Sequence, residues 1–303
     1  MAGALNNDID RNLMKEPTDG VCDLIYDVGM HNGEDTAFYL HQGFRVVAIE
    51  ANPQLADLAR RKFSSEIESG RLTILNVGIA ERAGTGTFWV CDDVSVWSSF
   101  QEKLTSREGK KHHSIEIQTR RFCEILEEYG IPFYLKVDIE GSDYLCLRDL
   151  VGRPLPRFIS VEAESSENVD DLANAGPVEN LSLLYNLGYR RFKLIRQADF
   201  SAEFESDFEA FIQRLVKSAA YGKLRLPVFS QLAKHLTSHE QLYRKHRYRF
   251  PTDGSGPWGN GTPGVWLSFE QAKVVHIKAR RRYARRARKV RGHSFWYDWH
   301  ATF

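Results

Sequence analysis

Short apolar runs alternate with amphipathic segments over the first two thirds of the chain. The apolar run at residues 24–28 is too short for a helix and stops at Gly29, so it predicts a buried strand. A helix is predicted after it, beginning near Asp35. A second strand at 45–50 and a second helix at 53–63 follow. This order predicts a βαβ unit with parallel strands and a right-handed crossover.

The same reading predicts six or seven strands in all and a three-layer α/β sandwich with a mostly parallel sheet. The further predicted strands are 71–79, 133–143, 157–164 and 189–196, with a short added strand at 87–90 and a strand candidate at 115–119. The further predicted helices are 122–129, 181–187 and 208–219. We expect an N-terminal arm over 1–22, a core domain over 23–198 and a C-terminal helical and loop extension over 199–303.

Composition narrows the class of protein. The 303 residues are 42% hydrophobic with a formal net charge of +1, which is typical of a globular chain with a substantial core. The four cysteines form no CxxC pair, so neither a zinc site nor a disulfide framework is predicted. No apolar run resembles a signal peptide or approaches the length of a membrane span, and we therefore expect a cytoplasmic protein without a membrane partner.

The first predicted turn carries candidate chemistry for an adenosine ligand. In parallel sheets ligands bind beyond the carboxyl ends of the strands, where Gly29, Gly33 and Glu50 would lie. Glu50 follows Asp27 by 23 positions and ends the second strand, so its carboxylate can accept hydrogen bonds from ribose hydroxyls.

The glycine spacing favours S-adenosylmethionine over a dinucleotide. A dinucleotide fingerprint has three glycines for close approach to a pyrophosphate, whereas this turn has two and is preceded by Asp27, which would repel that group. S-adenosylmethionine has no phosphate and carries an ammonium and a sulfonium, which suit a carboxylate. A nicotinamide-dependent oxidoreductase is therefore disfavoured. The alternative for Asp27 is that it only caps the neighbouring loop.

A second cluster of charged residues follows the predicted strand that begins at residue 133. Lys136, Asp138 and Glu140 alternate with apolar residues, so an extended chain would point all three to one side. Such charges are costly in a central strand unless they are paired or used. A structural ion pair is the alternative to a catalytic role. Glu162 ends the next predicted strand and would lie beside Asp138.

Three other segments leave two interpretations open. His112 and His113, in the polar stretch 91–118, could supply a base or contact substrate, or could be solvated. The Gly/Pro-rich loop 251–264 is either a substrate lid or a surface connection. The segment 273–291 has ten lysines and arginines and no acid.

The basic segment and the aromatic residues after it suggest an RNA-associated methyltransferase or RNA-binding protein. The alternative is a helix with a solvated basic face and an aromatic tail that docks on the domain. We favour the second, since the pI is 7.7 and no RNA-binding motif occurs. An intermediate interpretation is that the basic segment serves an anionic small-molecule acceptor.

Three motifs resemble those of the FkbM family of S-adenosylmethionine-dependent methyltransferases, in order and in spacing. They are Asp27-Val28-Gly29-x-x-x-Gly33, Ile49-Glu50-Ala51-Asn52-Pro53 and Lys136-Val137-Asp138-Ile139-Glu140-Gly141. The resemblance covers about residues 22–196 and implies a Rossmann-like class I methyltransferase that binds S-adenosylmethionine. It implies cofactor contacts from Asp27, Gly29, His31, Asn32, Gly33, Asp35, Glu50, Ala51, Asn52, Asn76 and Val77.

The resemblance also implies an O-methyltransferase that acts on a hydroxyl of a sugar, polyketide or other secondary metabolite. The protein would align the hydroxyl with the methyl donor and remove its proton. We predict Asp138 as the proton acceptor or its orienting partner and Lys136 for electrostatic positioning, with Glu140 and Glu162 in support. No metal is predicted, although a divalent cation held by Asp138, Glu140 and Glu162 is an alternative.

Overall fold

The computed structural model describes residues 21–163, 179–203, 215, 238–251, 254–287 and 296–303. Residues 1–20 of the predicted arm, the predicted helix 208–219 except residue 215, and residues 288–291 of the basic segment lie outside the described residues. Val21 and Cys22, predicted as the end of the arm, belong to the first strand.

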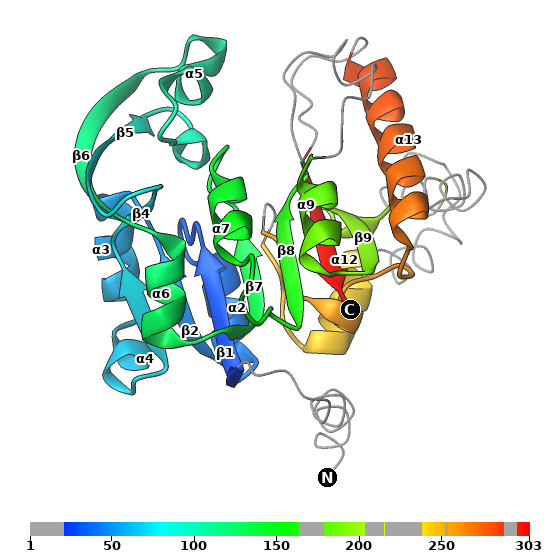
Figure 1. Cartoon of the computed structure of the whole chain (residues 1–303), viewed down its shortest axis with the longest axis horizontal. Coiled ribbons are helices and arrows are strands. Elements are labelled where there is room, and N and C mark those ends of the chain that lie inside the picture. Colours follow the sequence, from blue (N-terminus) through cyan, green and yellow to red (C-terminus); the bar gives the residue numbers. More distant parts are fainter. Residues whose placement is uncertain (1–20, 164–178, 204–214, 216–237, 252–253, 288–295) are drawn as a thin grey trace, which may run out of the picture.

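A central sheet of eight strands organises the fold (Figure 1). Across the sheet the strands are β10 (Ser201–Ala202), β9 (Arg191–Arg196), β11 (Tyr297–Thr302), β8 (Phe158–Glu162), β7 (Pro132–Val137), β1 (Val21–Val28), β2 (Arg45–Ile49) and β3 (Leu72–Leu75). The run from β8 to β3 is parallel, while β11 pairs antiparallel with both β8 and β9. The sheet is therefore mostly parallel, as predicted.

Strand β1 shows why these short apolar runs become central strands. Leu24, Tyr26 and Val28 pack into one core cluster, and Ile25 packs into the cluster on the other face. All four side chains are buried, because helices cover both faces of the sheet. Asp27 follows Ile25 on the second face and is the one charged side chain that β1 buries.

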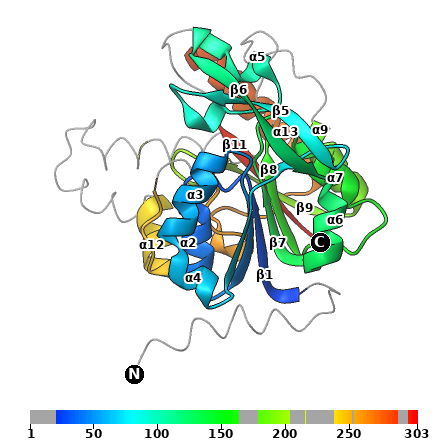
Figure 2. The ribbon, with the colours of Figure 1, turned by 90° about the vertical axis from the view of Figure 1, so that its left-hand side faces the viewer.

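Helices form the outer two layers (Figure 2). On the face of Ile25 lie α2 (Glu34–His41), α3 (Pro53–Lys62), α4 (Ser64–Glu68) and α12 (Ser238–His246). On the other face lie α6 (Phe122–Tyr129), α7 (Asp143–Asp149), α9 (Glu179–Leu187) and α13 (Phe269–Ala287). The predicted three-layer α/β sandwich is confirmed. No helix within the described parts of the chain is both long enough and apolar enough to cross a membrane.

A second, three-stranded sheet projects beyond the carboxyl ends of the central strands (Figure 1). It consists of β4 (Gly78–Ile79), β6 (His112–Arg120) and β5 (Gly84–Cys91), and η2 (Ser95–Trp97), α5 (Glu102–Thr105) and η3 (Arg107–Gly109) lie between β5 and β6. The strands predicted at 87–90 and 115–119 exist, but they are longer than predicted and pair with each other. They do not extend the central sheet.

Strand β11 comes from the segment predicted as a C-terminal extension. All six of its residues are buried, and it lies between β8 and β9. The predicted docking of the aromatic tail thus takes the form of a strand inside the central sheet. Tyr297, Trp299 and Ala301 alternate with polar residues, a pattern that indicates a strand with one exposed face, so periodicity does not reveal a strand buried on both faces between two others.

Candidate active site

A cavity lies at the carboxyl ends of the central strands, where parallel sheets bind their ligands. Eight of the predicted site residues line it: Gly29, His31, Glu50, Ala51, Val77, Asp138, Glu140 and Glu162. Seven do not line it: Asp27, Asn32, Gly33, Asp35, Asn52, Asn76 and Lys136. Five members of the second group lie behind the cavity wall and hold the first group in place, as the contacts below show: Asp27, Asp35, Asn52, Asn76 and Lys136. Asn32 is exposed, and Gly33 is the N-cap of α2.

The first turn is packed directly against the end of β7. Gly29 has φ 85°, and a Cβ atom there would lie 1.8 Å from the carbonyl oxygen of Asp138. The Gly29 and Met30 N–H groups both donate to the Ile49 carbonyl at 3.0 Å, which ties the turn to β2. The motif therefore needs glycine at position 29 because β1, β2 and β7 converge there.

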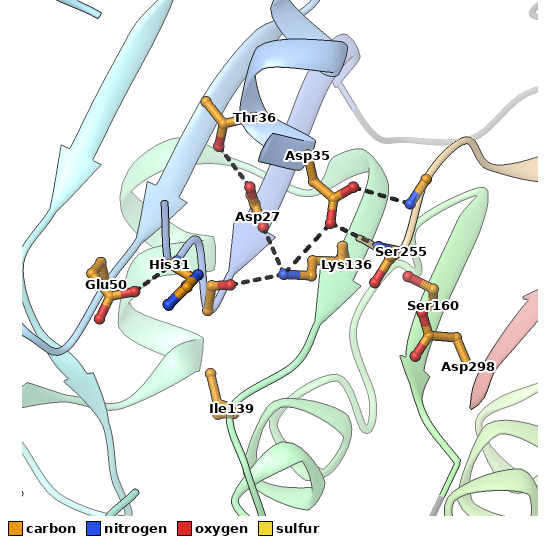
Figure 3. Close-up of polar contacts among 12 residues, drawn as sticks. Asp27, His31, Asp35, Thr36, Glu50, Lys136, Ile139, Ser160, Ser255 and Asp298 are labelled. Carbon is orange, nitrogen blue, oxygen red and sulfur yellow. Dashed lines mark hydrogen bonds and ion pairs between the residues drawn. The ribbon is translucent and has the colours of Figure 1, made fainter. Parts of the chain in front are cut away.

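A buried charge network lies beneath this turn (Figure 3). Asp27 and Lys136 are register partners on β1 and β7, and Lys136 Nζ lies 3.1 Å from Asp27 Oδ1 and 3.9 Å from Asp35 Oδ2. Lys136 Nζ also donates to the Gly29 carbonyl at 2.7 Å, and Thr36 Oγ1 donates to Asp27 Oδ2 at 2.6 Å. The network fixes the turn from below without reaching the cavity.

Electrostatics keep the Lys136 ammonium charged in this site. Burial opposes the charge, but the carboxylates of Asp27, Asp138 and Asp35 raise the pKa of Lys136 above its ordinary value. Lys136 is 4% exposed. The structure therefore places it as a positioning residue for the turn rather than in contact with the cavity.

Glu50 projects from the end of β2 into the cavity wall. Its Oε2 accepts a hydrogen bond from the His31 N–H and its Oε1 accepts one from the Asn52 N–H, each at 2.8 Å. Burial raises the pKa of Glu50 to about 7, against the effect of these two backbone donors. Each carboxylate oxygen retains a lone pair for a further donor, which suits ribose hydroxyls.

Two of the three asparagines predicted as cofactor contacts, Asn52 and Asn76, form hydrogen bonds with the backbone near the cavity. Asn52 caps α3 by accepting from the Gln54 N–H at 3.0 Å. Asn76 Nδ2 donates to the carbonyls of Glu50 and Ala51 at 2.8 and 3.1 Å, which fixes the segment after β2. Their neighbours Ala51 and Val77 line the cavity.

The charged side chains at the end of β7 and after it do not all point to one side, although the sequence predicted that they would. β7 ends at Val137, and Glu140 has φ 46°, so Lys136, Asp138 and Glu140 do not point to one side as an extended chain would require. Lys136 faces the buried network, whereas Asp138 and Glu140 line the cavity. Glu140 pairs with Arg107 of η3 at 2.8 Å. Glu162, at the end of β8, completes this wall.

Several lining residues were not predicted from the sequence. The second sheet and the segment after β5 contribute Phe88, Ser95, Val96, Ser98 and Phe100, and distant parts of the chain contribute Gln197 and Trp296. His31 Nε2 lies 2.8 Å from Ser95 Oγ and joins this cover to the first turn. The length of the polar stretch 91–118 was the signal for a functional segment. No local pattern predicts that Gln197 and Trp296 reach the site.

The structure shows where the segments with two open interpretations lie. His112 and His113 lie on β6, pair with Glu102 and Asp92, and do not line the cavity. None of the described residues of the 251–264 loop lines it either. Trp258 of that loop stacks on Tyr134 at 5.3 Å. The loop packs under α2 and is therefore neither a lid on this cavity nor a plain surface connection.

The basic helix α13 does not present a uniform charged face. Arg280 is 5% exposed, Arg282 contacts Glu203, and Lys273 pairs with Glu270 within the helix. Its buried residues Ala272, Val275 and Ala279 pack into the core. Within the described part of the chain, the helix is a packed layer of the fold.

The cavity residues fit the predicted S-adenosylmethionine. Gly29 supplies a turn without a side chain, Glu50 supplies an acceptor for ribose hydroxyls, and Asp138 supplies negative charge for a cationic ligand. No Lys or Arg among the described residues lines the cavity, so nothing there is arranged for a pyrophosphate. Nor do the described residues contain three or more His, Cys, Asp or Glu side chains grouped to hold a metal ion.

Comparison with known proteins agrees with these features. The family model of the methyltransferase FkbM domain matches residues 27–191. No curated protein matches the chain.

Solved structures that resemble the chain include three methyltransferases. An O-methyltransferase from Bacillus cereus in complex with SAH is 14% identical, with 57% of this chain and 67% of that chain covered and a TM-score of 0.31. A SAM-dependent methyltransferase from Archaeoglobus fulgidus is 13% identical, with coverage of 81% and 89% and a TM-score of 0.33. Precorrin-6y C5,15-methyltransferase from Geobacter metallireducens is 12% identical, with coverage of 65% and 79% and a TM-score of 0.30.

Proposed function

This chain belongs to the FkbM family of S-adenosylmethionine-dependent methyltransferases, and we propose that it is an O-methyltransferase acting on a hydroxyl of a sugar or other secondary metabolite. The observation that supports this proposal is the presence of Asp138 in the same cavity as Gly29 and Glu50. A carboxylate is thereby available beside the residues that suit the cofactor.

In the proposed chemistry the protein aligns the acceptor hydroxyl with the methyl donor and removes the proton of the hydroxyl. The bound cofactor supplies an activated methyl group on a sulfonium. Asp138 would accept the proton of the acceptor hydroxyl, and the oxygen of that hydroxyl would take the methyl group, while the bonding pair of the carbon–sulfur bond would stay on sulfur. Glu140, held by Arg107 at 2.8 Å, keeps the segment after β7 in position. Lys136 positions Gly29 from below at 2.7 Å.

Binding of S-adenosylhomocysteine is the first test of the cofactor site. We expect calorimetric titration to show binding of S-adenosylhomocysteine and no binding of NAD, which serves as the control. The expected dissociation constant for S-adenosylhomocysteine is micromolar, which corresponds to a binding free energy of about 8 kcal/mol. Binding of NAD instead would contradict the assignment of the cavity.

Replacement of Asp138 tests the proposed proton acceptor. We expect Asp138→Asn to lower methyl transfer by about a hundredfold or more, because the variant loses general base catalysis, while S-adenosylhomocysteine affinity stays within a few fold. Asp57→Asn is the matched control, since Asp57 is exposed on α3 and does not line the cavity. Unchanged turnover in Asp138→Asn would remove Asp138 from the mechanism.

A further inference from the structure

Glu162 is the acidic residue of the cavity that the proposed chemistry does not use. It ends β8, is 8% exposed and lines the cavity. Its backbone carbonyl accepts from Asn180 Nδ2 at 2.8 Å, but its carboxylate has no hydrogen bond or ion pair to any described residue. A buried carboxylate without a partner is costly, so its presence in a cavity wall points to a group that arrives with the ligand.

The surrounding charges increase this cost. Asp298 on β11 is the register partner of Glu162 and is 1% exposed. Its Oδ1 accepts from Gln197 Nε2 at 2.7 Å, and Gln197 lines the cavity as well. Like charges directly opposite on neighbouring strands repel each other. Burial, and then Glu140, Asp138, Asp143 and Asp298, raise the pKa of Glu162 well above its ordinary value.

The cations near the site have other partners among the described residues. Lys136 is paired with Asp27, and Arg107 is paired with Glu140. His31 is the one lining side chain of the described cavity that can carry a positive charge, and burial lowers its pKa. When they are ionised, the lining carboxylates without a cationic partner are Glu50, Asp138 and Glu162, whereas the cofactor brings only one net positive charge, from its ammonium, sulfonium and carboxylate. An uncompensated negative charge therefore remains.

We propose that the acceptor hydroxyl compound also carries a protonated amine, which Glu162 binds as its ion-pair partner in the cavity. The inference rests on the proposed function, since it names the substrate class of the same site. Trp296 also lines this cavity, and an indole face is a favourable neighbour for an organic cation. An anionic acceptor is disfavoured by the same wall.

Three two-carbon hydroxyl compounds of different charge test the proposal directly. The complex with S-adenosylhomocysteine is titrated with ethanolamine, ethylene glycol and glycolate at pH 8, and binding is followed by chemical-shift changes of the protein. We expect ethanolamine to bind about tenfold more tightly than ethylene glycol, as a charge-assisted hydrogen bond predicts, and glycolate to bind most weakly. Equal binding of the three, no binding of ethanolamine, or a preference for glycolate overturns the proposal.

Two variants assign the preference to Glu162. We expect Glu162→Gln to remove the preference for ethanolamine while affinity for S-adenosylhomocysteine stays within about twofold. Glu81→Gln replaces an exposed residue that does not line the cavity, and this variant is expected to retain the preference. If Glu162→Gln still prefers ethanolamine, the proposal is overturned. If that variant does not fold, the comparison of the three compounds on the wild-type protein decides. Failure to bind S-adenosylhomocysteine would instead count against the proposed function, because the two ligands are measured separately.

Discussion

Lys136 is the residue on which the geometry of the first turn depends most. Its ammonium contacts carboxylates from β1 and α2 and the carbonyl of Gly29, and it is buried together with both acids. Removing one partner from a buried network leaves the other charges uncompensated. The motif lysine thus acts on the cofactor site through the backbone that it holds.

We therefore expect Lys136→Met to lower the free energy of unfolding by about 3–5 kcal/mol, because Asp27 and Asp35 are left buried without their cation. Urea denaturation at neutral pH measures this change. Arg45→Ala is the control, since the Arg45–Asp23 pair is about half exposed and its loss is expected to cost below about 1 kcal/mol. Equal costs for the two variants would mean that the buried network contributes no more than a surface pair.

Two glycines with nearly the same φ allow the cost of backbone strain to be separated from the cost of a steric clash. Gly29 has φ 85° and Gly43 has φ 87°, but a Cβ atom on Gly43 would meet nothing within 4 Å. We expect Gly43→Ala to cost about 1–2 kcal/mol of stability from its left-handed backbone alone. Gly29→Ala is expected to cost more and to abolish S-adenosylhomocysteine binding, since the new atom displaces the end of β7.

Thermal denaturation and calorimetric titration of the two glycine variants make this comparison. The contradicting result is a Gly29→Ala protein that binds S-adenosylhomocysteine as well as Gly43→Ala does. In that case the contact between Gly29 and the Asp138 carbonyl would not control the cavity.

At the scale of elements, the pairing of β8 with β11 carries a pH dependence. Asp298 and Glu162 face each other in register, and burial, then the charge of Asp138, raises the pKa of Asp298 from 3.8 to about 7. Between these two values the native state holds more protons than the unfolded state. The free energy of unfolding therefore falls as the pH rises through this window.

We expect Asp298→Asn to be more stable than the wild type at pH 8, on the order of 1–3 kcal/mol, since one pKa unit corresponds to about 1.4 kcal/mol. The variant is also expected to show a smaller loss of stability between pH 4 and pH 7. Urea denaturation across this pH range, with Asp57→Asn as an exposed control, measures both effects. A variant less stable than wild type at pH 8 would show that the Gln197 hydrogen bond outweighs the repulsion.

For the whole molecule, the sequence predicted the layers and the site edge better than the contacts of single side chains. Gly29, Glu50, Asp138 and Glu162 follow strand ends, and parallel strands bring such ends to one edge, so their convergence was predictable. Lys136 and Asp27 were predicted near the site, but only the register of β1 against β7 shows that they pair with each other.

The parts that were not predicted depend on contacts between distant segments. The cover over the cavity forms because β5 and β6 pair with each other, and Trp296 reaches the cavity because β11 enters the central sheet. Periodicity reports only neighbours along the chain, so it contains no signal for such pairings.

The position of β11 also bears on the order of folding. β9 and β11 are adjacent in the sheet, yet the 100 residues 197–296 separate them in the sequence. Closing so long a loop costs only modestly more entropy than closing a short one, but pairings of this kind form slowly. Until β11 arrives, β8 and β9 each have an unpaired edge, and such edges template association between chains. The time before this strand inserts is thus the interval in which the nascent protein is most exposed to aggregation, and a chaperone that shields sheet edges would act there.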